Sequence, residues 1–192
     1  VINRVSKQPN WKTVREVSAQ FGSWNKRRIA ADVGQAINDA SAFRVTGVFE
    51  DSDSYRDDYN VRRWGVNPTY SVSISDNTAV TVGYEHFEDD RVADRGQPSE
   101  PTAFNGRRTR IDADPSVFFG DPDRSDVTAY VDALTALVEH DFAGGATLRN
   151  RTRIANYDKF YQNIFPGAVT AARTQVNLSA YNNATQRTNV FN

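Results

Sequence analysis

The sequence predicts an all-β protein built of antiparallel, up-and-down strands. Apolar and polar residues alternate over segments of about ten residues, which is the pattern of strands with one apolar face. Short runs of Gly, Asn, Asp and Ser separate several of these segments and favour tight turns. The polar positions carry more charges than a small packed core can bury. Together these observations favour a transmembrane β-barrel whose apolar face meets lipid and whose charged face lines a wet or plugged interior.

Three strands are predicted near the start, at residues 14–22, 26–36 and 42–50. In each of them, most apolar side chains fall on alternate positions. The connections at 22–25 and 38–41 consist mainly of Gly, Asn, Asp and Ser, and both are expected to be turns.

Residues 64–87 are the clearest hairpin of the sequence. The arm 64–74 has an apolar or aromatic residue at every second position, and 80–87 returns after a turn at 75–78. Pro68 lies within the first arm and has no backbone N–H to give to a neighbouring strand. We therefore predict a bulge or a locally broken pairing at this proline.

The rest of the sequence alternates between strands and long polar stretches. A structureless connection as long as the second of these stretches is uncommon in a compact soluble domain and is usually functional. The strands are predicted at residues 127–140, 147–161 and, as a start only, 188–192, and the polar stretches at 51–60, 88–125 and 163–186.

The lengths of the connections form a pattern. They are short after the second, fourth and sixth strands and long after the third, fifth and seventh, with 22–25 as the exception. Outer-membrane barrels have short periplasmic turns and long extracellular loops, whereas a soluble β-sandwich has no such division. The pattern favours a barrel, and a soluble sandwich stays as the alternative.

Composition excludes several other classes. The 192 residues carry a net charge of −1, which argues against a general nucleic-acid binder. There is no cysteine, and therefore neither a disulfide framework nor a thiolate site. No apolar run approaches the length of a transmembrane helix. The absence of methionine leads us to expect a portion of a longer chain.

No metal site and no enzymatic activity are expected. The acidic run at 51–58 fits a solvated loop, and 121–126 lacks the Gly and the distal Glu of a calcium loop. His86 and His140 fall near the ends of predicted strands, where an amphipathic ring suits a membrane interface. The sequence has no Gly-x-Ser-x-Gly element to suggest a hydrolase.

Several segments resemble, in the same order, the TonB-dependent siderophore receptors, in particular those for ferric hydroxamates and catecholates. Residues 1–9 are similar to the last plug strand of that family, and residues 21–25 to its first barrel hairpin. The further similar segments are 51–57, 83–96, 118–125, 148–153 and 187–192.

The resemblance implies a barrel of about 22 strands closed by an N-terminal plug. Residues 1–9 would end the plug domain, and residues 10–192 would form the N-terminal part of the outer-membrane β-barrel, with about seven to eight strands. An open sheet has unpaired edges that lipid does not tolerate, so we expect further strands to close the barrel.

The implied function is ferric siderophore uptake across the cell outer membrane of a Gram-negative bacterium, energised through TonB. TonB would contact a plug segment outside this sequence, and outer-membrane lipid would surround the barrel. The ferric siderophore would be the transported ligand, and no cofactor is expected. The alternatives are a passive porin-like channel and a soluble β-sandwich that serves as an adhesin or a carbohydrate-binding module.

Aromatic and arginine residues of the long loops and strand ends are the candidate ligand-binding residues. Tyr and Phe supply stacking area, and Arg supplies charge and hydrogen-bond donors. The row Arg149, Arg151 and Arg153 is instead expected to pair with acidic residues of neighbouring strands or of the plug. The candidates are Tyr55, Arg56, Tyr59, Arg91, Arg95, Phe118, Phe119, Tyr157 and Tyr161.

Overall fold

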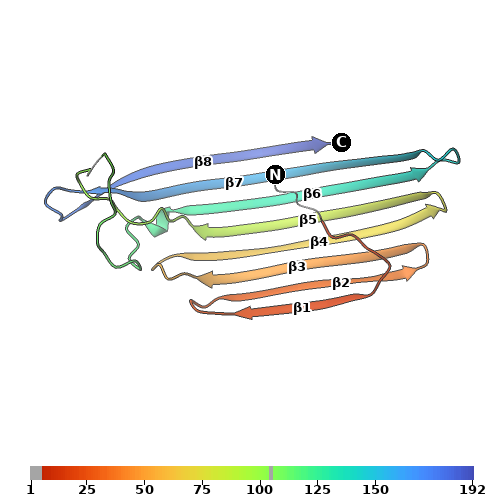
Figure 1. Ribbon diagram of the computed structural model, residues 1–192, viewed down its shortest axis with the longest axis horizontal. Helices are drawn as coiled ribbons and strands as arrows, with labels where there is room; N and C mark the ends of the chain where they lie inside the picture. The colour runs from red at the N-terminus through yellow and green to blue at the C-terminus, as the bar shows by residue number, and fades with distance from the viewer. Residues whose placement is uncertain (1–5, 104–105) are drawn as a thin grey trace.

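The computed structural model describes residues 6–103 and 106–192, which form one antiparallel sheet of eight strands in sequence order (Figure 1). The described residues contain no second sheet packed on the first, which does not fit the sandwich alternative. No helix in this part of the chain is long and apolar enough to cross a membrane. The elements are β1 Val14–Phe21, β2 Arg27–Asn38, β3 Ser41–Asp53, β4 Asn60–Ser75, β5 Thr78–Val92, the short 3-10 helix η1 Pro122–Arg124, β6 Asp126–Asp141, β7 Thr147–Val169 and β8 Val176–Phe191.

One face of the sheet, here called the apolar face, carries hydrophobic side chains although it is exposed. Leu134 is 50% exposed and Ile154 is 45% exposed, and they pair with each other across β6 and β7. A continuous apolar surface of this kind requires a partner other than water. The full row at this level is Val33, Val45, Pro68, Tyr84, Leu134, Ile154 and Val190, one residue from each of β2 to β8.

The opposite face, here called the polar face, carries ion pairs between strands. Successive side chains of β6 point to opposite faces, so Glu139 lies on the polar face and Asp132 lies on the apolar face. The expected pairing of the arginine row is confirmed for its two ends, Arg149 with Glu139 and Arg153 with Glu85. The ion pairs across this face include Arg28–Glu50, Arg44–Asp32, Arg63–Asp89, Arg149–Glu139 and Arg153–Glu85.

The N-terminal segment crosses the sheet on the polar face (Figure 1). The Lys7 ammonium lies 2.6 Å from Asp32, and Arg44 donates to the carbonyl of Gln8 at 3.2 Å. Part of the predicted plug tail, residues 1–5, lies outside the described residues. The boundary between a plug and a barrel after residue 9 therefore stays a prediction.

The predicted loop at 163–186 is wrong. β7 continues to Val169, β8 begins at Val176, and the two pair from Arg153 to Val169 of β7. Both faces of this hairpin carry polar residues, so it lacks the contrast in hydrophobicity that marks a strand in the sequence. The eighth strand therefore begins at Val176, well before the predicted start at residue 188.

The long connection also begins later than predicted. Residues 88–92 belong to β5 and pair with both β4 and β6, so Arg91 lies on a strand. At one end of the sheet the connections are 39–40, 76–77 and 142–146. At the other end they are 22–26, 54–59, 93–125 and 170–175, so the predicted difference in length rests mainly on 93–125.

The ladder at Pro68 is broken on one side. Pro68 pairs regularly with Val45 of β3. On the β5 side the ladder stops at Val66 and resumes at Thr69 in the same register. The missing N–H of proline accounts for this gap, which confirms the local break in pairing without a bulge.

Candidate functional site

The β5–β6 loop, residues 93–125, is closed at its neck and fastened to β7. The Ala93 N–H donates to the Ser125 carbonyl at 2.7 Å, and Ser99 forms an isolated bridge with Ala168. Gly120 packs so closely on β7 that a Cβ atom there would lie 2.1 Å from the Ile164 carbonyl oxygen. A glycine is therefore required at this contact.

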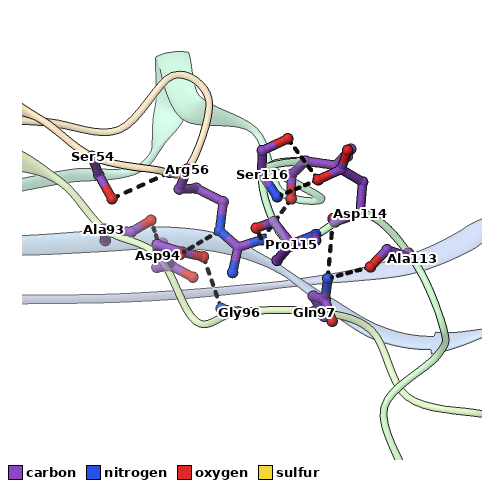
Figure 2. A network of polar contacts seen from close by, with 12 residues as sticks. Ser54, Arg56, Ala93, Asp94, Gly96, Gln97, Ala113, Asp114, Pro115 and Ser116 are labelled. Atoms are coloured by element: carbon purple, nitrogen blue, oxygen red, sulfur yellow. Dashed lines mark hydrogen bonds and ion pairs between the residues drawn. The ribbon is translucent and has the colours of Figure 1, made fainter. Parts of the chain in front are cut away.

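Arg56 joins the loop at 54–59 to the β5–β6 loop. Its side chain is only 6% exposed, and its Nε lies 3.0 Å from Asp94 (Figure 2). The same guanidinium donates to the carbonyls of Pro115 and Val117. Charge-assisted bonds of this kind, made away from water, hold two loops that are far apart in the sequence.

The carbonyls that Arg56 contacts belong to a turn stabilised by Asp114. Its carboxylate accepts hydrogen bonds from the backbone N–H and the hydroxyl of Ser116, both at 2.8 Å (Figure 2). The backbone bond and then the hydroxyl bond lower the pKa of Asp114, because both favour the ionised form. The ionised carboxylate of Asp114 therefore supports this turn.

Arg95 lies among three aromatic rings. Its guanidinium carbon is 4.2 Å from the ring centre of Phe165, 5.5 Å from that of Tyr181 and 5.6 Å from that of Tyr161. Its Nε also donates to the Tyr161 hydroxyl at 3.1 Å. Among the described residues, no carboxylate forms an ion pair with Arg95. The arrangement presents a cation within an aromatic frame, here called the Arg95 cage.

A cavity of about 300 Å³ lies further along the polar face of the sheet. Tyr157 lines it and is on the same face of β7 as Tyr161, because the two residues are four positions apart. Arg151 and Arg153 line it too, and Ser6 and Gln8 cover one side. The cage and the cavity therefore follow each other along one strand.

The structure brings some of the predicted residues together and separates others. Tyr55 is exposed and packs edge-on against Trp24, with its neighbour Arg56 over the ring. Tyr59 lies in the same loop.

Arg91 lies on the polar face of β5, 3.4 Å from Asp89, and is separate from the cage. Phe118 and Phe119 are half-buried where the β5–β6 loop meets β7.

Two residues of the cage, Phe165 and Tyr181, are absent from the sequence-based set. Both lie in the stretch 163–186, which the sequence places in a loop. Tyr181 lies between Ala180 and Asn182 in a strand that has no hydrophobic face. The sequence around it therefore shows no regular alternation of apolar and polar residues that would predict a strand. Only the pairing of β7 with β8 brings Phe165 and Tyr181 to Arg95.

The two histidines belong to networks away from the cage. His86 lies between Asp132 at 2.8 Å and Glu88 at 3.1 Å on the apolar face, with its ring centre 4.6 Å from that of Trp64. His140 contacts the Thr78 hydroxyl at 2.8 Å. In the described ranges no group of three His, Cys, Asp or Glu residues is arranged to hold a metal ion.

Comparison of the sequence with curated proteins finds receptors. The chain is 31% identical over 172 residues to the catecholate siderophore receptor Fiu of Escherichia coli K12, and the match covers 83% of this chain and 22% of Fiu. It is 28% identical over 150 residues to the metal-pseudopaline receptor CntO of Pseudomonas aeruginosa, covering 77% of this chain and 20% of CntO. The chain thus spans about a fifth of the length of these relatives. No protein-family model matches it.

Comparison with solved structures also finds receptors. The closed form of the ferric-catecholate import receptor Fiu from E. coli K12 matches with a TM-score of 0.77 and 26% identity, over 96% of this chain and 28% of that one. The ferripyoverdine receptor of the outer membrane of P. aeruginosa matches with a TM-score of 0.76 and 21% identity, over 96% of this chain and 25% of that one. The second match, at this low identity, supports the fold alone.

Proposed function

Because the chain is homologous to TonB-dependent siderophore receptors, we propose that it forms part of the wall of an outer-membrane receptor that imports a ferric siderophore with energy from TonB. The apolar face would meet lipid, and the polar face would line the interior. The ferric siderophore is the transported ligand in this proposal, and no cofactor is needed. The protein would act in the cell outer membrane of a Gram-negative bacterium.

The single observation that carries the proposal beyond homology is the Arg95 cage. A ferric siderophore is a bulky complex, often anionic, with aromatic or amide surfaces. The cage offers stacking area from Tyr161, Phe165 and Tyr181 on one face of the sheet, and a cation that has no acidic partner among the described residues. Of the sequence-based candidates, Arg95, Tyr157 and Tyr161 fit direct contact with the ligand best.

The remaining candidates differ in their position. Tyr55 and Tyr59 lie in the loop at 54–59, and Phe118 and Phe119 lie in the β5–β6 loop. All four are proposed to limit access to the interior. Arg56 is proposed to position the β5–β6 loop, since its guanidinium is buried in bonds within the protein.

Growth on single ferric siderophores as the iron source tests the function. Deletion of the gene should abolish growth on at least one of them, and restoring the gene should restore it. Discharge of the inner-membrane proton gradient should stop uptake of radioactive iron through the protein, because energy is expected to come from that membrane. Unchanged growth on every siderophore after deletion would remove the transport proposal, and uptake without the gradient would favour the passive channel.

A further inference from the structure

The β7–β8 hairpin interrupts the apolar face of the sheet with polar side chains. A tilted strand crosses the hydrocarbon of a membrane in about 9–11 residues, which on β7 are about residues 148–158, counted from the short connection at 142–146. The side chains that this stretch and the paired end of β8 direct outward are mostly polar. They are Asn150, Thr152, Asn156 and Asp158 of β7 and Gln186, Thr188 and Asn192 of β8, here called the β7–β8 stripe.

The neighbouring strands are apolar at the same level. Val138 of β6 and Val80 of β5 lie in the row of Asn150. In the row of Thr152 the corresponding residues are Ala136 and Val82. The stripe is therefore a property of the hairpin and not of one depth in the membrane.

The rest of a receptor would leave this outward surface uncovered. A barrel closes through the two edges of the sheet, which are β1 and β8 here, and a plug fills its interior. Neither of these additions lies over the outward face of β7 and β8. A partner for the stripe therefore has to come from the surroundings of the barrel.

The side chains of the stripe are hydrogen-bonding groups that hydrocarbon cannot satisfy. The Nδ2 atom of Asn150 donates to Asn192 at 2.9 Å, and that of Asn192 donates to Thr152 at 2.9 Å. The Thr188 hydroxyl donates to Asn156 at 2.8 Å. A side-chain amide has two N–H groups and an oxygen with two lone pairs, so each amide can also bond a partner outside the sheet. Contact with a polar partner is favoured, because amides buried in hydrocarbon lose hydrogen bonds to water.

The chemistry of the stripe is complementary to itself. Amides and hydroxyls both donate and accept hydrogen bonds, and Asp158 is the one charged member of the stripe. A two-fold axis along the membrane normal brings a surface against the same surface of a second copy at equal depth. Amides would then meet amides, as polar side chains do where membrane-spanning helices associate.

The hairpin is also long enough for an interface. From Asn150 to Ile164 it extends about 46 Å at roughly 3.3 Å per residue, and with half of each neighbouring strand it is about 14 Å wide. This gives roughly 650 Å² on each copy, close to the about 800 Å² that each partner contributes to a stable complex. Phe160 and the exposed Leu178 lie on the same outward face beyond the stripe and add apolar contacts.

We propose that the β7–β8 stripe is a lateral interface through which two copies of the protein associate in the outer membrane. The inference goes beyond the proposed uptake and rests only on the apolar face of the sheet lying in lipid. Each copy keeps its own interior, because the stripe and the polar face are opposite sides of the sheet.

Disulfide cross-linking in native outer membranes tests the contact. The full-length protein, without other cysteines, carries Asn156→Cys, Thr188→Cys or the control Gln35→Cys, which lies on the same face of the sheet but on β2. Under copper phenanthroline, positions 156 and 188 should join two copies about tenfold faster than position 35, because a disulfide requires two closely spaced Cβ atoms. Equal rates at the three positions would overturn the inference, as would a product joined to a different protein.

Substitution of the amide tests the energy of association. In the full-length protein, Asn156→Leu should raise the dissociation constant of the dimer in detergent about tenfold, because the facing amide loses a hydrogen bond. Gln35→Leu is the matched control and should equal the wild type. The dissociation constant is measured by sedimentation, and the compact, fast-migrating form on a gel shows that each variant is folded.

A monomeric wild type, or equal dissociation constants for Asn156→Leu and the wild type, would overturn the inference. Growth on ferric siderophores is recorded in parallel. A dimer in cells whose growth on every siderophore is unchanged by deletion of the gene would overturn the proposed uptake alone. Uptake by a monomeric protein would overturn the lateral interface alone.

Discussion

Arg56 and Arg95 have the same charged group and opposite surroundings. Arg56 is buried, and its guanidinium bonds to the Asp94 carboxylate and to two backbone carbonyls. Arg95 is exposed at its frame of rings and has no ion pair in the described part of the chain. The first side chain therefore holds the β5–β6 loop in place, whereas the second stays exposed, as the proposed contact with a ligand requires.

We predict that Arg56→Ala loosens the β5–β6 loop. The substitution leaves Asp94 without its partner and frees the carbonyls of Pro115 and Val117, so the loop should open more often. Trypsin added to intact cells should then cut after the exposed Arg107 and Arg108 about tenfold faster.

Arg124→Ala is the control for this experiment. Arg124 belongs to the same loop, but it is exposed and its ion pair with Asp121 spans 4.0 Å. It should change the cleavage rate little, because surface pairs contribute little to stability. Equal cleavage of the Arg56→Ala variant and the wild type would show that Arg56 does not hold the loop.

At the scale of the strands, agreement between sequence and structure follows the contrast between the two faces. β1, β2, β3 and β6 lie within a few residues of their predicted bounds, because each has an apolar face and a polar one. The β7–β8 hairpin extends beyond its predicted bounds because polar residues occupy both faces there. The Arg56 network could not be predicted, since it joins residues about 60 positions apart through the folded loops.

We predict that Pro68→Val stabilises the β4–β5 pair. Valine has a backbone N–H, which would lie at the gap opposite Tyr84, and valine also favours strands. One backbone hydrogen bond between β4 and β5 should therefore form, and it should stabilise the pair by about 0.5–1.5 kcal/mol. The temperature at which the detergent-solubilised protein loses its compact, fast-migrating form on a gel should rise. Pro122→Val is the control, because this proline begins η1, where an N–H needs no partner within the helix. A lower unfolding temperature for Pro68→Val would mean that the gap has another cause.

At the scale of the whole molecule, the two faces of the sheet require different surroundings. Leu134 lies on the apolar face, and its neighbour Thr135 lies on the polar face, where it accepts a hydrogen bond from Arg153. These 192 residues contain no cysteine, so within them a single introduced cysteine reports on its own position.

We predict opposite labelling of Leu134→Cys and Thr135→Cys in membranes. A lipid-soluble nitroxide should quench a fluorophore at position 134 and not one at position 135, because only the first faces hydrocarbon. Equal quenching at the two positions would contradict the orientation of the sheet. Cysteine is chosen at position 134 because it is small and uncharged. An arginine there would reduce the stability of the protein by about 2–4 kcal/mol near the bilayer midplane.

The order of the strands also has a consequence for how the chain assembles and diversifies. Every strand in the sheet pairs with its neighbours in the sequence, so most contacts form by closing short segments, which is kinetically fast. The exception is the closure of residues 93–125 between β5 and β6. The entropy of closing a loop grows only with the logarithm of its length, by about 0.6 kcal/mol for each doubling. This connection can therefore gain or lose residues at little cost to folding, and selection can alter the surface around Arg95 while the sheet beneath it stays the same.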